Sequence, residues 1–241
     1  MAEVPDISIV VPVFDEAGAA PALAREIAAA FAGRAFEMLF VDDASRDGTR
    51  AALSALKAEL PELRVLGHRK NAGQSRAIRS GVLAARAPIV VTLDGDGQND
   101  PADGPRLVDA LAAGPPSLGL VGGERVKRQD SAAKRIASKL GNGVRKRLLH
   151  DCANDTGCGL KAFRREAFLR LPYFDHIHRY LPAMMLREGY EVAFQPVNHR
   201  HRQTGSSKYT NLGRLWASAS DLLGVVWLQR RSRNPHGVEE T

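Results

Sequence analysis

Two aspartates separated by one glycine, Asp94-Gly95-Asp96, are the residues of this 241-residue sequence best suited to chemistry. They follow an apolar run, and alternate residues at the end of a strand direct both carboxylates to one side. The glycine lets the phosphates of a ligand approach the backbone, and Gln98 adds a neutral oxygen. Such oxygens bind divalent cations, and a cation turns the repulsion between an acidic loop and a pyrophosphate into attraction. The pattern predicts a site for a metal and a phosphate-bearing ligand.

Two common nucleotide-binding motifs do not account for this loop. A dinucleotide fingerprint that uses Gly95 and Gly97 would require a third glycine where Asp100 stands. The sequence contains no Walker A loop, which argues against an ordinary P-loop nucleotide hydrolase.

Acidic residues also follow two earlier apolar runs, at residues 15–16 and 42–47. Asp47 or Thr49 is expected to cap the helix that follows. If bases near them in the sequence do not pair with them, the three acidic loops are expected to repel one another unless a cation joins them. A divalent metal bound through oxygen atoms is the simplest explanation.

Basic residues are concentrated in the second half of the chain. The formal net charge is +7, and residues 125–147 contain nine Lys and Arg against the single acid Asp130. A solvated helix face, a phosphate site, a nucleic-acid site and an anionic membrane surface are all compatible with such a run.

Alternating strands and helices are predicted to position these loops. Short apolar runs typical of buried strands occur at residues 7–13, 38–41, 65–66, 89–93 and 118–121. Apolar residues with helical spacing lie between them, at 23–31, 53–60, 78–85 and 107–111. This alternation predicts an α/β fold with a mostly parallel sheet flanked by helices. Ligands are expected beyond the carboxyl ends of its strands.

Seven segments in order carry a resemblance to a known family. They are PVFDE, VDDASRDGT, HRKNAGQSRAIRSG, VVTLDGDGQNDP, VGGERVKRQDS, DTGCGLKAFRRE and HRHRQTGSSKY. The sequence resembles the family-two glycosyltransferases over residues 5–210, particularly the branch that includes dolichyl-phosphate mannosyltransferase and the bacterial enzymes that glycosylate undecaprenyl phosphate. The resemblance implies a Rossmann-like GT-A fold, a nucleotide-diphosphate sugar donor, Mg or Mn, and inversion at the anomeric carbon.

The resemblance also implies roles for individual residues. The base and ribose of the nucleotide are assigned to Pro12, Phe14, Glu16 and Asp43. In the DxD motif, Asp96 and Gln98 resemble the metal ligands, with Asp94 facing the sugar and diphosphate beside Gly95. Arg125, Arg128 and Lys134 resemble the basic residues that bind phosphate, and Arg125 and Arg128 are also assigned catalytic roles. Arg202 and Lys208 resemble the basic residues of a loop that comes late in the chain and binds the donor.

The chemistry of the acceptor separates two enzymatic hypotheses. A hydroxyl acceptor requires a general base, for which Asp155 is the candidate in this part of the chain, although a turn residue before Thr156-Gly157 is the simpler interpretation. A polyprenyl phosphate is already anionic and needs cationic binding groups instead. We expect the phosphate acceptor. A basic nucleic-acid-binding protein is the non-enzymatic alternative, and the acidic sheet edge and the lack of interleaved aromatic residues argue against it.

The C-terminal segment is predicted to be an amphipathic helix. Apolar residues recur at steps of three and four over residues 212–227, and Arg230, Arg231 and Arg233 follow. The apolar stripe is expected to meet an anionic membrane surface, a membrane partner subunit or the catalytic domain itself. We therefore expect a catalytic domain over residues 1–210 and a helical, basic extension over 211–241. With no signal-peptide pattern and no disulfide framework, the protein is expected at the cytoplasmic face of the membrane.

Overall fold

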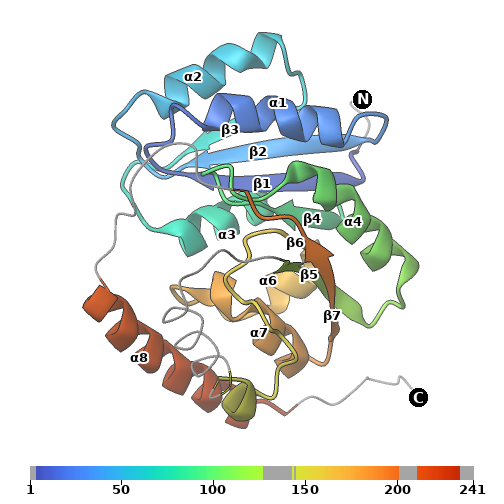
Figure 1. Cartoon of the computed structure of the whole chain (residues 1–241), viewed down its shortest axis with the longest axis vertical. Coiled ribbons are helices and arrows are strands. Elements are labelled where there is room, and N and C mark those ends of the chain that lie inside the picture. Colours follow the sequence, from blue (N-terminus) through green and yellow to red (C-terminus); the bar gives the residue numbers. More distant parts are fainter. Residues whose placement is uncertain (1–3, 127–142, 144, 201–210, 234–241) are drawn as a thin grey trace, which may run out of the picture.

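The computed structural model describes residues 4–126, 143, 145–200 and 211–233, with side chains from residue 220 onward in the last of these segments. Its centre is a seven-stranded sheet in the order β3-β2-β1-β4-β6-β5-β7 (Figure 1). The strands are β1 Ile7–Val13, β2 Phe36–Asp42, β3 Leu63–Gly67, β4 Ile89–Thr92, β5 Leu118–Arg125, β6 Lys161–Arg164 and β7 Glu191–Val197. All neighbouring pairs are parallel except those of β6, which runs antiparallel to β4 and β5.

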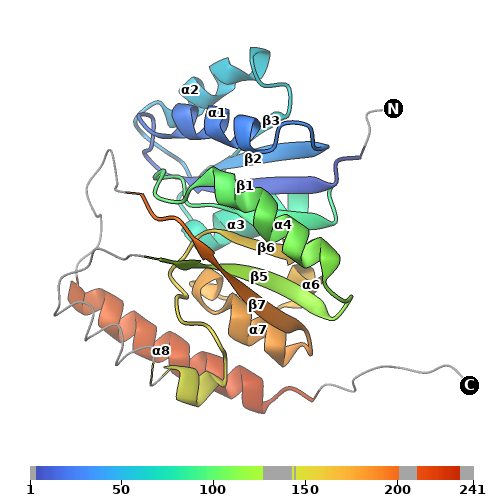
Figure 2. The ribbon, with the colours of Figure 1, turned by 45° about the vertical axis from the view of Figure 1, so that its right-hand side comes forward.

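Helices cover both faces of this sheet (Figure 2). The helices are α1 Ala20–Ala30, α2 Thr49–Ala55, α3 Gln74–Ala84, α4 Gly104–Ala113, α6 Arg165–Arg170, α7 Leu181–Arg187 and α8 Asn211–Arg230. Short 3-10 turns occur at η1 Leu56–Ala58, η2 Pro101–Asp103 and η3 Ile177–Arg179. Apolar side chains of α1, α2 and α4 share one core cluster, and those of α3, α6, α7 and α8 share the other.

Strand β1 shows why these segments form a two-sided sheet. All seven of its residues are buried. Ile9 and Val11 belong to the core under α1 and α4, whereas Val10 belongs to the core under α3. Helix α3 approaches β1 closely at Gly81, where a Cβ atom would lie 2.4 Å from Val10 Cγ1. The first half of the chain therefore packs as a continuous α/β unit with its loops gathered at the two ends of the strands.

The predicted α/β fold with a mostly parallel sheet is confirmed. Each of the five apolar runs lies within or overlaps one of the strands β1 to β5, and each group with helical spacing lies in or beside α1, α2 with η1, α3 or α4. The alternation does not continue through the second half, where β6 reverses direction and enters the middle of the sheet. This reversal was not expected from the sequence.

The C-terminal helix α8 packs against the rest of the protein on one side. Val225 is fully buried, and Gln229 donates to the carbonyls of Leu149 and Ala183. His176 Nδ1 lies 2.7 Å from Asp221 Oδ2. Among the described residues, no helix is long and apolar enough to cross a membrane. The expected domain boundary at residue 210 falls outside the described residues and stays a prediction.

Candidate active site

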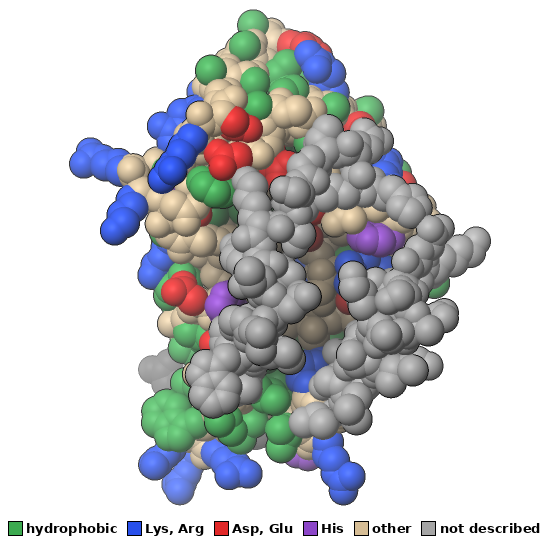
Figure 3. Space-filling view, turned by 60° about the vertical axis from the view of Figure 1, so that its left-hand side comes forward, with side chains coloured by type: hydrophobic (Ala, Val, Ile, Leu, Met, Phe, Trp, Pro, Cys, Tyr) green, Lys and Arg blue, Asp and Glu red, His purple; other side chains and the backbone are tan. Residues whose placement is uncertain are grey.

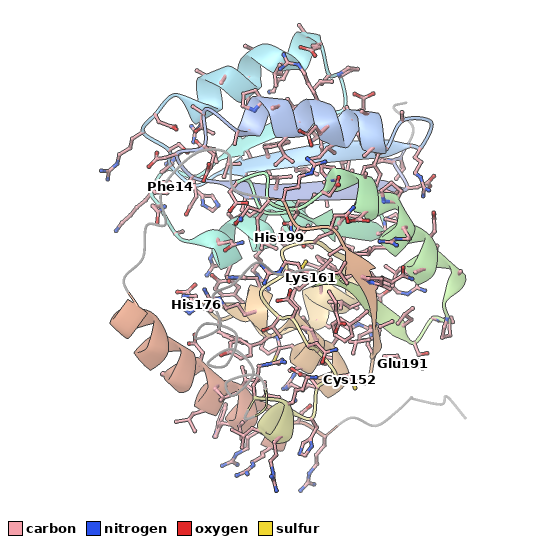
Figure 4. All side chains as sticks on the ribbon, in the orientation of Figure 1. Phe14, Cys152, Lys161, His176, Glu191 and His199 are labelled. Atoms are coloured by element: carbon pink, nitrogen blue, oxygen red, sulfur yellow. The ribbon has the colours of Figure 1, made fainter. Side chains whose placement is uncertain are left out.

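A cavity of about 710 Å³ opens at the carboxyl ends of β1, β2 and β4. One end is lined by the loops after β1 and β2, and the other by the segment that leads into β6 and by η3. Figure 4 labels Phe14 in the loop after β1 and Lys161 at the middle of the sheet. The cavity is in the size range of small-molecule sites. Its polar and charged lining residues include Glu16, Asp43, Asn71, Gln74, Thr92, Asp94, Asp96, Thr156, Lys161, His178 and Arg179.

Asp94 is the acid most strongly perturbed by this cavity. Its side chain is partly buried in the cavity wall, and burial raises the pKa of Asp94 to about 6, with the nearby charge of Asp96 adding to the effect. Gln74 donates a hydrogen bond of 2.7 Å to Asp94 Oδ1, and the positive charges of Lys161 and Arg125 offset only part of the increase. The pair of aspartates therefore has an electrostatic need for additional positive charge.

Two glycines allow the aspartate loop its close contacts. A Cβ atom at Gly95 would lie 2.7 Å from the carbonyl oxygen of Pro12, so the loop can lie directly against the end of β1. A Cβ atom at Gly159 would lie 2.2 Å from Asp94 Oδ2. Thr92 also donates to the Gly159 carbonyl at 2.8 Å. These contacts bring the segment before β6 against Asp94, so that it forms a wall of the cavity.

Cationic groups approach the same end of the cavity. Lys161 begins β6, is 5% exposed and donates to the carbonyl of Cys158, and burial lowers the pKa of its ammonium. Arg125 ends β5. Burial opposes its charge, but Asp155 more than offsets this and raises the pKa of Arg125.

His178, which also lines the cavity, is not cationic. Its ring lies 2.7 Å from the Ser75 hydroxyl, and burial lowers the pKa of His178 to about 3. His178 is therefore neutral near pH 7.

Asp43 organises the opposite end of the cavity. Its carboxylate accepts hydrogen bonds from the backbone amides of Ala72, at 2.8 Å, and Gly73, at 2.7 Å. His68 Nδ1 lies 2.6 Å from Asp43 Oδ1, and Asn71 donates to the Asp43 carbonyl. These bonds fix the start of α3 beside the cavity. The predicted contact of Asp43 with the base or ribose stays a prediction.

The expectation that three acidic loops require a shared cation is wrong for most of their residues. Asp42 pairs with Arg50 at 2.8 Å, and Asp100 pairs with Arg200 at 2.6 Å. Asp47 accepts from the amide and hydroxyl of Thr49 and from the Ala17 amide. The expectation that Asp47 or Thr49 caps this helix is wrong, because the N-cap of α2 is Gly48, which makes no side-chain cap hydrogen bond. The protein's own donors neutralise these acids, and some of the donors come from distant parts of the chain.

The remaining acids fit a Mg²⁺ or Mn²⁺ ion. Asp94 and Asp96 offer carboxylates that repel each other, and the amide oxygen of Gln98 is a further hard donor two residues on. Within the described parts of the chain, no group of three or more His, Cys, Asp or Glu side chains gathers around one point. A cation held here would need ligand phosphate oxygens or water to complete its shell, which is usual for Mg²⁺.

The structure brings most of the predicted residues together. Seven of them line the cavity: Pro12, Phe14, Glu16, Asp43, Asp94, Gly95 and Asp96. Gln98 lies in the same loop, and its backbone N–H donates to Asp96 Oδ1. Arg125 lies behind the cavity wall and contacts Asp155. Four others, Arg128, Lys134, Arg202 and Lys208, lie outside the described residues.

Several residues of the cavity were not singled out from the sequence. Gln74 and Lys161 stand within two of the quoted segments, HRKNAGQSRAIRSG and DTGCGLKAFRRE, and that was the available signal. His178 and Arg179 belong to η3 and stand in none of these segments. Their position in the cavity wall depends on the path of the chain after β6.

Comparison with known proteins agrees with this geometry. The model of the family described as "Glycosyl transferase family 2" matches residues 8–171. The chain belongs to this family. It is 37% identical over 207 residues to undecaprenyl-phosphate 4-deoxy-4-formamido-L-arabinose transferase of Shewanella sediminis, a match that covers 84% of the chain and 61% of that relative. It is 31% identical over 236 residues to dodecaprenyl-phosphate galacturonate synthase of Rhizobium johnstonii, covering 95% of the chain and 69% of that protein.

Solved structures support the GT-A fold. Glucosyl-3-phosphoglycerate synthase of Mycobacterium tuberculosis, in complex with Mn²⁺, UDP and glucosyl-3-phosphoglycerate, aligns with a TM-score of 0.67 at 19% identity, covering 96% of this chain and 82% of that one. A mannosyltransferase of Pyrobaculum calidifontis in complex with GDP-Man and Mn²⁺ aligns with a TM-score of 0.67 at 20% identity, covering 98% and 67%. At these identities the likeness establishes the fold.

Proposed function

We propose that the protein transfers a sugar from a GDP- or UDP-linked donor to a polyprenyl phosphate, with inversion at the anomeric carbon. The observation that carries this proposal is the Asp94–Asp96 pair, whose mutual repulsion contributes to the raised pKa of Asp94 and which lies in a cavity that Lys161 and Arg179 also line. The identities to two polyprenyl-phosphate sugar transferases, over 84% and 95% of the chain, support this acceptor class.

The donor is proposed to lie across the ends of β1, β2 and β4. Pro12, Phe14 and Glu16 line the end of the cavity that would hold the base and ribose. Asp96 and Gln98 would hold Mg²⁺ or Mn²⁺, and Asp94 would face the sugar and diphosphate. The bound metal would supply positive charge against the charge that develops on the departing diphosphate. Arg202 and Lys208, outside the described residues, remain candidates for the same role.

The acceptor phosphate is proposed to approach from the β5–β6 side. A phosphate oxygen is anionic near neutral pH and needs no proton removed before it attacks the anomeric carbon, so the protein must mainly bind and orient it. Arg125 is suited to this task because it is firmly charged and a guanidinium matches phosphate geometry. Arg128 and Lys134, which lie outside the described residues, are proposed to contribute in the same way.

Helix α8 is proposed to bring the protein to the cytoplasmic face of an anionic membrane. Leu223 is 70% exposed and Trp227 58% exposed, although both are large apolar residues. The basic residues Arg230, Arg231 and Arg233 follow, and all three are exposed. Figure 3 shows hydrophobic side chains gathered beside Lys and Arg at the lower end of this face. Apolar side chains beside cations suit an interface with anionic lipid, and each arginine would contribute about 1 kcal/mol.

The activity is tested with purified protein, a panel of radiolabelled nucleotide sugars and polyprenyl phosphate, with Mn²⁺ or with excess chelator. We expect lipid-linked product only with metal, and none from Asp96→Asn. The control is Asp109→Asn, which removes an exposed acid of α4 that pairs with Arg34. Undiminished activity in chelator, or full activity of Asp96→Asn, contradicts the metal assignment.

The membrane proposal is tested by flotation with vesicles that contain anionic lipid. We expect Trp227→Ser and high salt each to reduce binding, because one removes apolar area and the other screens charge. Leu83→Ser removes a side chain that is 54% exposed on α3 and serves as the control. If Trp227→Ser binds vesicles as the parent does but loses an oligomer, the exposed face of α8 meets a protein partner instead.

A further inference from the structure

Arg125 and Asp155 form a two-point ion pair behind the cavity wall. Arg125 Nε lies 2.5 Å from Asp155 Oδ2, and Arg125 Nη2 lies 2.7 Å from Asp155 Oδ1. The two side chains are only 16% and 7% exposed. The pair joins the end of β5 to the segment before β6, across 30 residues of chain. A pair of this geometry fixes the orientation of both groups.

Neighbouring contacts attach the same segment to β5. The side chain of Glu124 accepts hydrogen bonds from the backbone and side-chain nitrogens of Asn154, at 3.2 and 2.7 Å. Asp155 follows Asn154 directly, so two consecutive residues of β5 bind two consecutive residues of the segment. Residues 156–159, which line the cavity, come next. Asp155 therefore attaches the segment to β5 directly before residues 156–159, the cavity wall that contacts Asp94.

This arrangement decides between two roles for Asp155. A general base must direct a carboxylate oxygen at the proton of the acceptor. Both oxygens of Asp155 instead receive hydrogen bonds from one guanidinium, and the side chain is nearly inaccessible. A carboxylate in this position orients the arginine.

We propose that Asp155 is a positioning residue, which holds the Arg125 guanidinium toward the acceptor phosphate and anchors wall residues 156–159 against Asp94. Asp155 takes no proton during the reaction. This inference rests on the proposed function in one respect, namely that the acceptor is a phosphate that Arg125 binds. It assigns a role to a residue that a hydroxyl-transfer mechanism would use as its base.

The test is a double-mutant cycle of the parent, Asp155→Asn, Arg125→Met and the double variant. Steady-state kinetics with polyprenyl phosphate in detergent give kcat and the acceptor KM, and thermal unfolding gives Tm. We expect Asp155→Asn to raise the acceptor KM about tenfold, as is typical when the partner that orients a binding group is lost. If Asp155 acts on the acceptor through Arg125, the removal of Arg125 also removes that effect, so the double variant should match Arg125→Met within about twofold.

A matched pair elsewhere serves as the control. Arg34 and Asp109 make the same two-point contact, at 2.6 and 2.9 Å, on the surface. Arg34→Met and Asp109→Asn should leave kcat and the acceptor KM unchanged.

Two results overturn the inference. One is an unchanged acceptor KM in Asp155→Asn, and the other is a double variant whose kcat falls by the product of the two single losses, as an independent base requires. If Asp155→Asn does not fold, the comparison of Arg125→Met with the double variant still decides the question. A parent that transfers no sugar to polyprenyl phosphate refutes the proposed function instead, and non-additive changes in Tm then still report the coupling of the pair.

Discussion

Two acids at opposite ends of the same sheet, Glu37 and Asp94, differ in how the protein treats their charge. Glu37, near the start of β2, is 1% exposed. Its carboxylate accepts hydrogen bonds from the Ser8 hydroxyl at 2.7 Å, the Arg86 amide at 2.7 Å and the Arg64 guanidinium at 2.6 Å. Burial is the largest single influence and raises the pKa of Glu37, but these bonds together lower it below its ordinary value.

For Asp94, beyond the end of β4, the influences that raise the pKa outweigh those that lower it. Burial and the charge of Asp96 raise its pKa to about 6, despite the hydrogen bond from Gln74. The comparison teaches that burial alone does not mark a functional acid. Glu37 has enough donors to be stable as an anion and joins elements together, whereas Asp94 has too few, which supports the cation that we propose beside it.

The largest expected effect is a loss of transfer activity when Asp94, but not Glu37, is substituted. Asp94→Asn keeps the shape of the side chain but removes the charge that we propose faces the sugar and diphosphate. We expect transfer to fall by at least about a hundredfold, as when one electrostatic group of an active site is lost. Tm should stay the same or rise, because a poorly stabilised charge has been removed. An active Asp94→Asn variant would show that Asp94 is not needed for transfer.

The second effect separates them by stability. Glu37→Gln leaves the partly exposed Arg64 and Arg86 without their shared anion, and we expect it to lower the free energy of unfolding by about 2–3 kcal/mol. Denaturant titration measures this loss. The kcat at a temperature where both proteins are folded should change little, since Glu37 lies at the far end of the sheet. A large change in kcat with unchanged stability would reverse the assignment.

The third effect is the pH dependence of stability. The pKa of Glu37 lies below its ordinary value of 4.5 in the folded protein, so the unfolded chain binds the proton more readily. The stability that Glu37 contributes is present above pH 4.5 and is lost as the pH falls through the lowered value. We expect the free energy of unfolding to decline more steeply below this pH in the parent than in Glu37→Gln. Parallel curves would show that other groups govern acid unfolding.

The smallest effect concerns metal. Mn²⁺ at ten times its dissociation constant should stabilise the parent by about 1.4 kcal/mol, a shift in Tm of a few degrees. Asp94→Asn should show a smaller shift because the negative charge beside the proposed ligands Asp96 and Gln98 is gone, whereas Glu37→Gln should show the same shift as the parent. Equal shifts in all three proteins would place the bound metal elsewhere.

The sequence predicted the elements whose signal is local. The runs that became β1, β2, β4 and β5 are apolar because those strands are largely buried, and the aspartate loop, residues 94–96, comes shortly after β4. The edge strand β3 is only partly buried and has the shortest run. Strand β6 reads Lys-Ala-Phe-Arg and has no apolar run, and its direction is set by its partners β4 and β5. Lys161 was missed as a cavity residue for this reason.

The compensation of acidic residues was also hidden from the sequence. His68 lies 25 residues from Asp43, and Arg200 lies 100 residues from Asp100. Only the tertiary structure brings such donors to the loops. The sequence therefore located the acidic edge correctly but could not show which of its acids were already neutralised.

The placement of β6 has a consequence for how the chain folds. The strands β3, β2, β1 and β4 form one part of the sheet, β5 and β7 form another, and β6 joins the two. Thr92 and Gly159, which meet beside Asp94, are 67 residues apart in the chain. Contacts of such long separation form slowly, because closing the intervening loop costs entropy before the contact is made. A chain still emerging from the ribosome can pair β1 with β2 early, but it can complete the cavity only after β6 has been made and inserted.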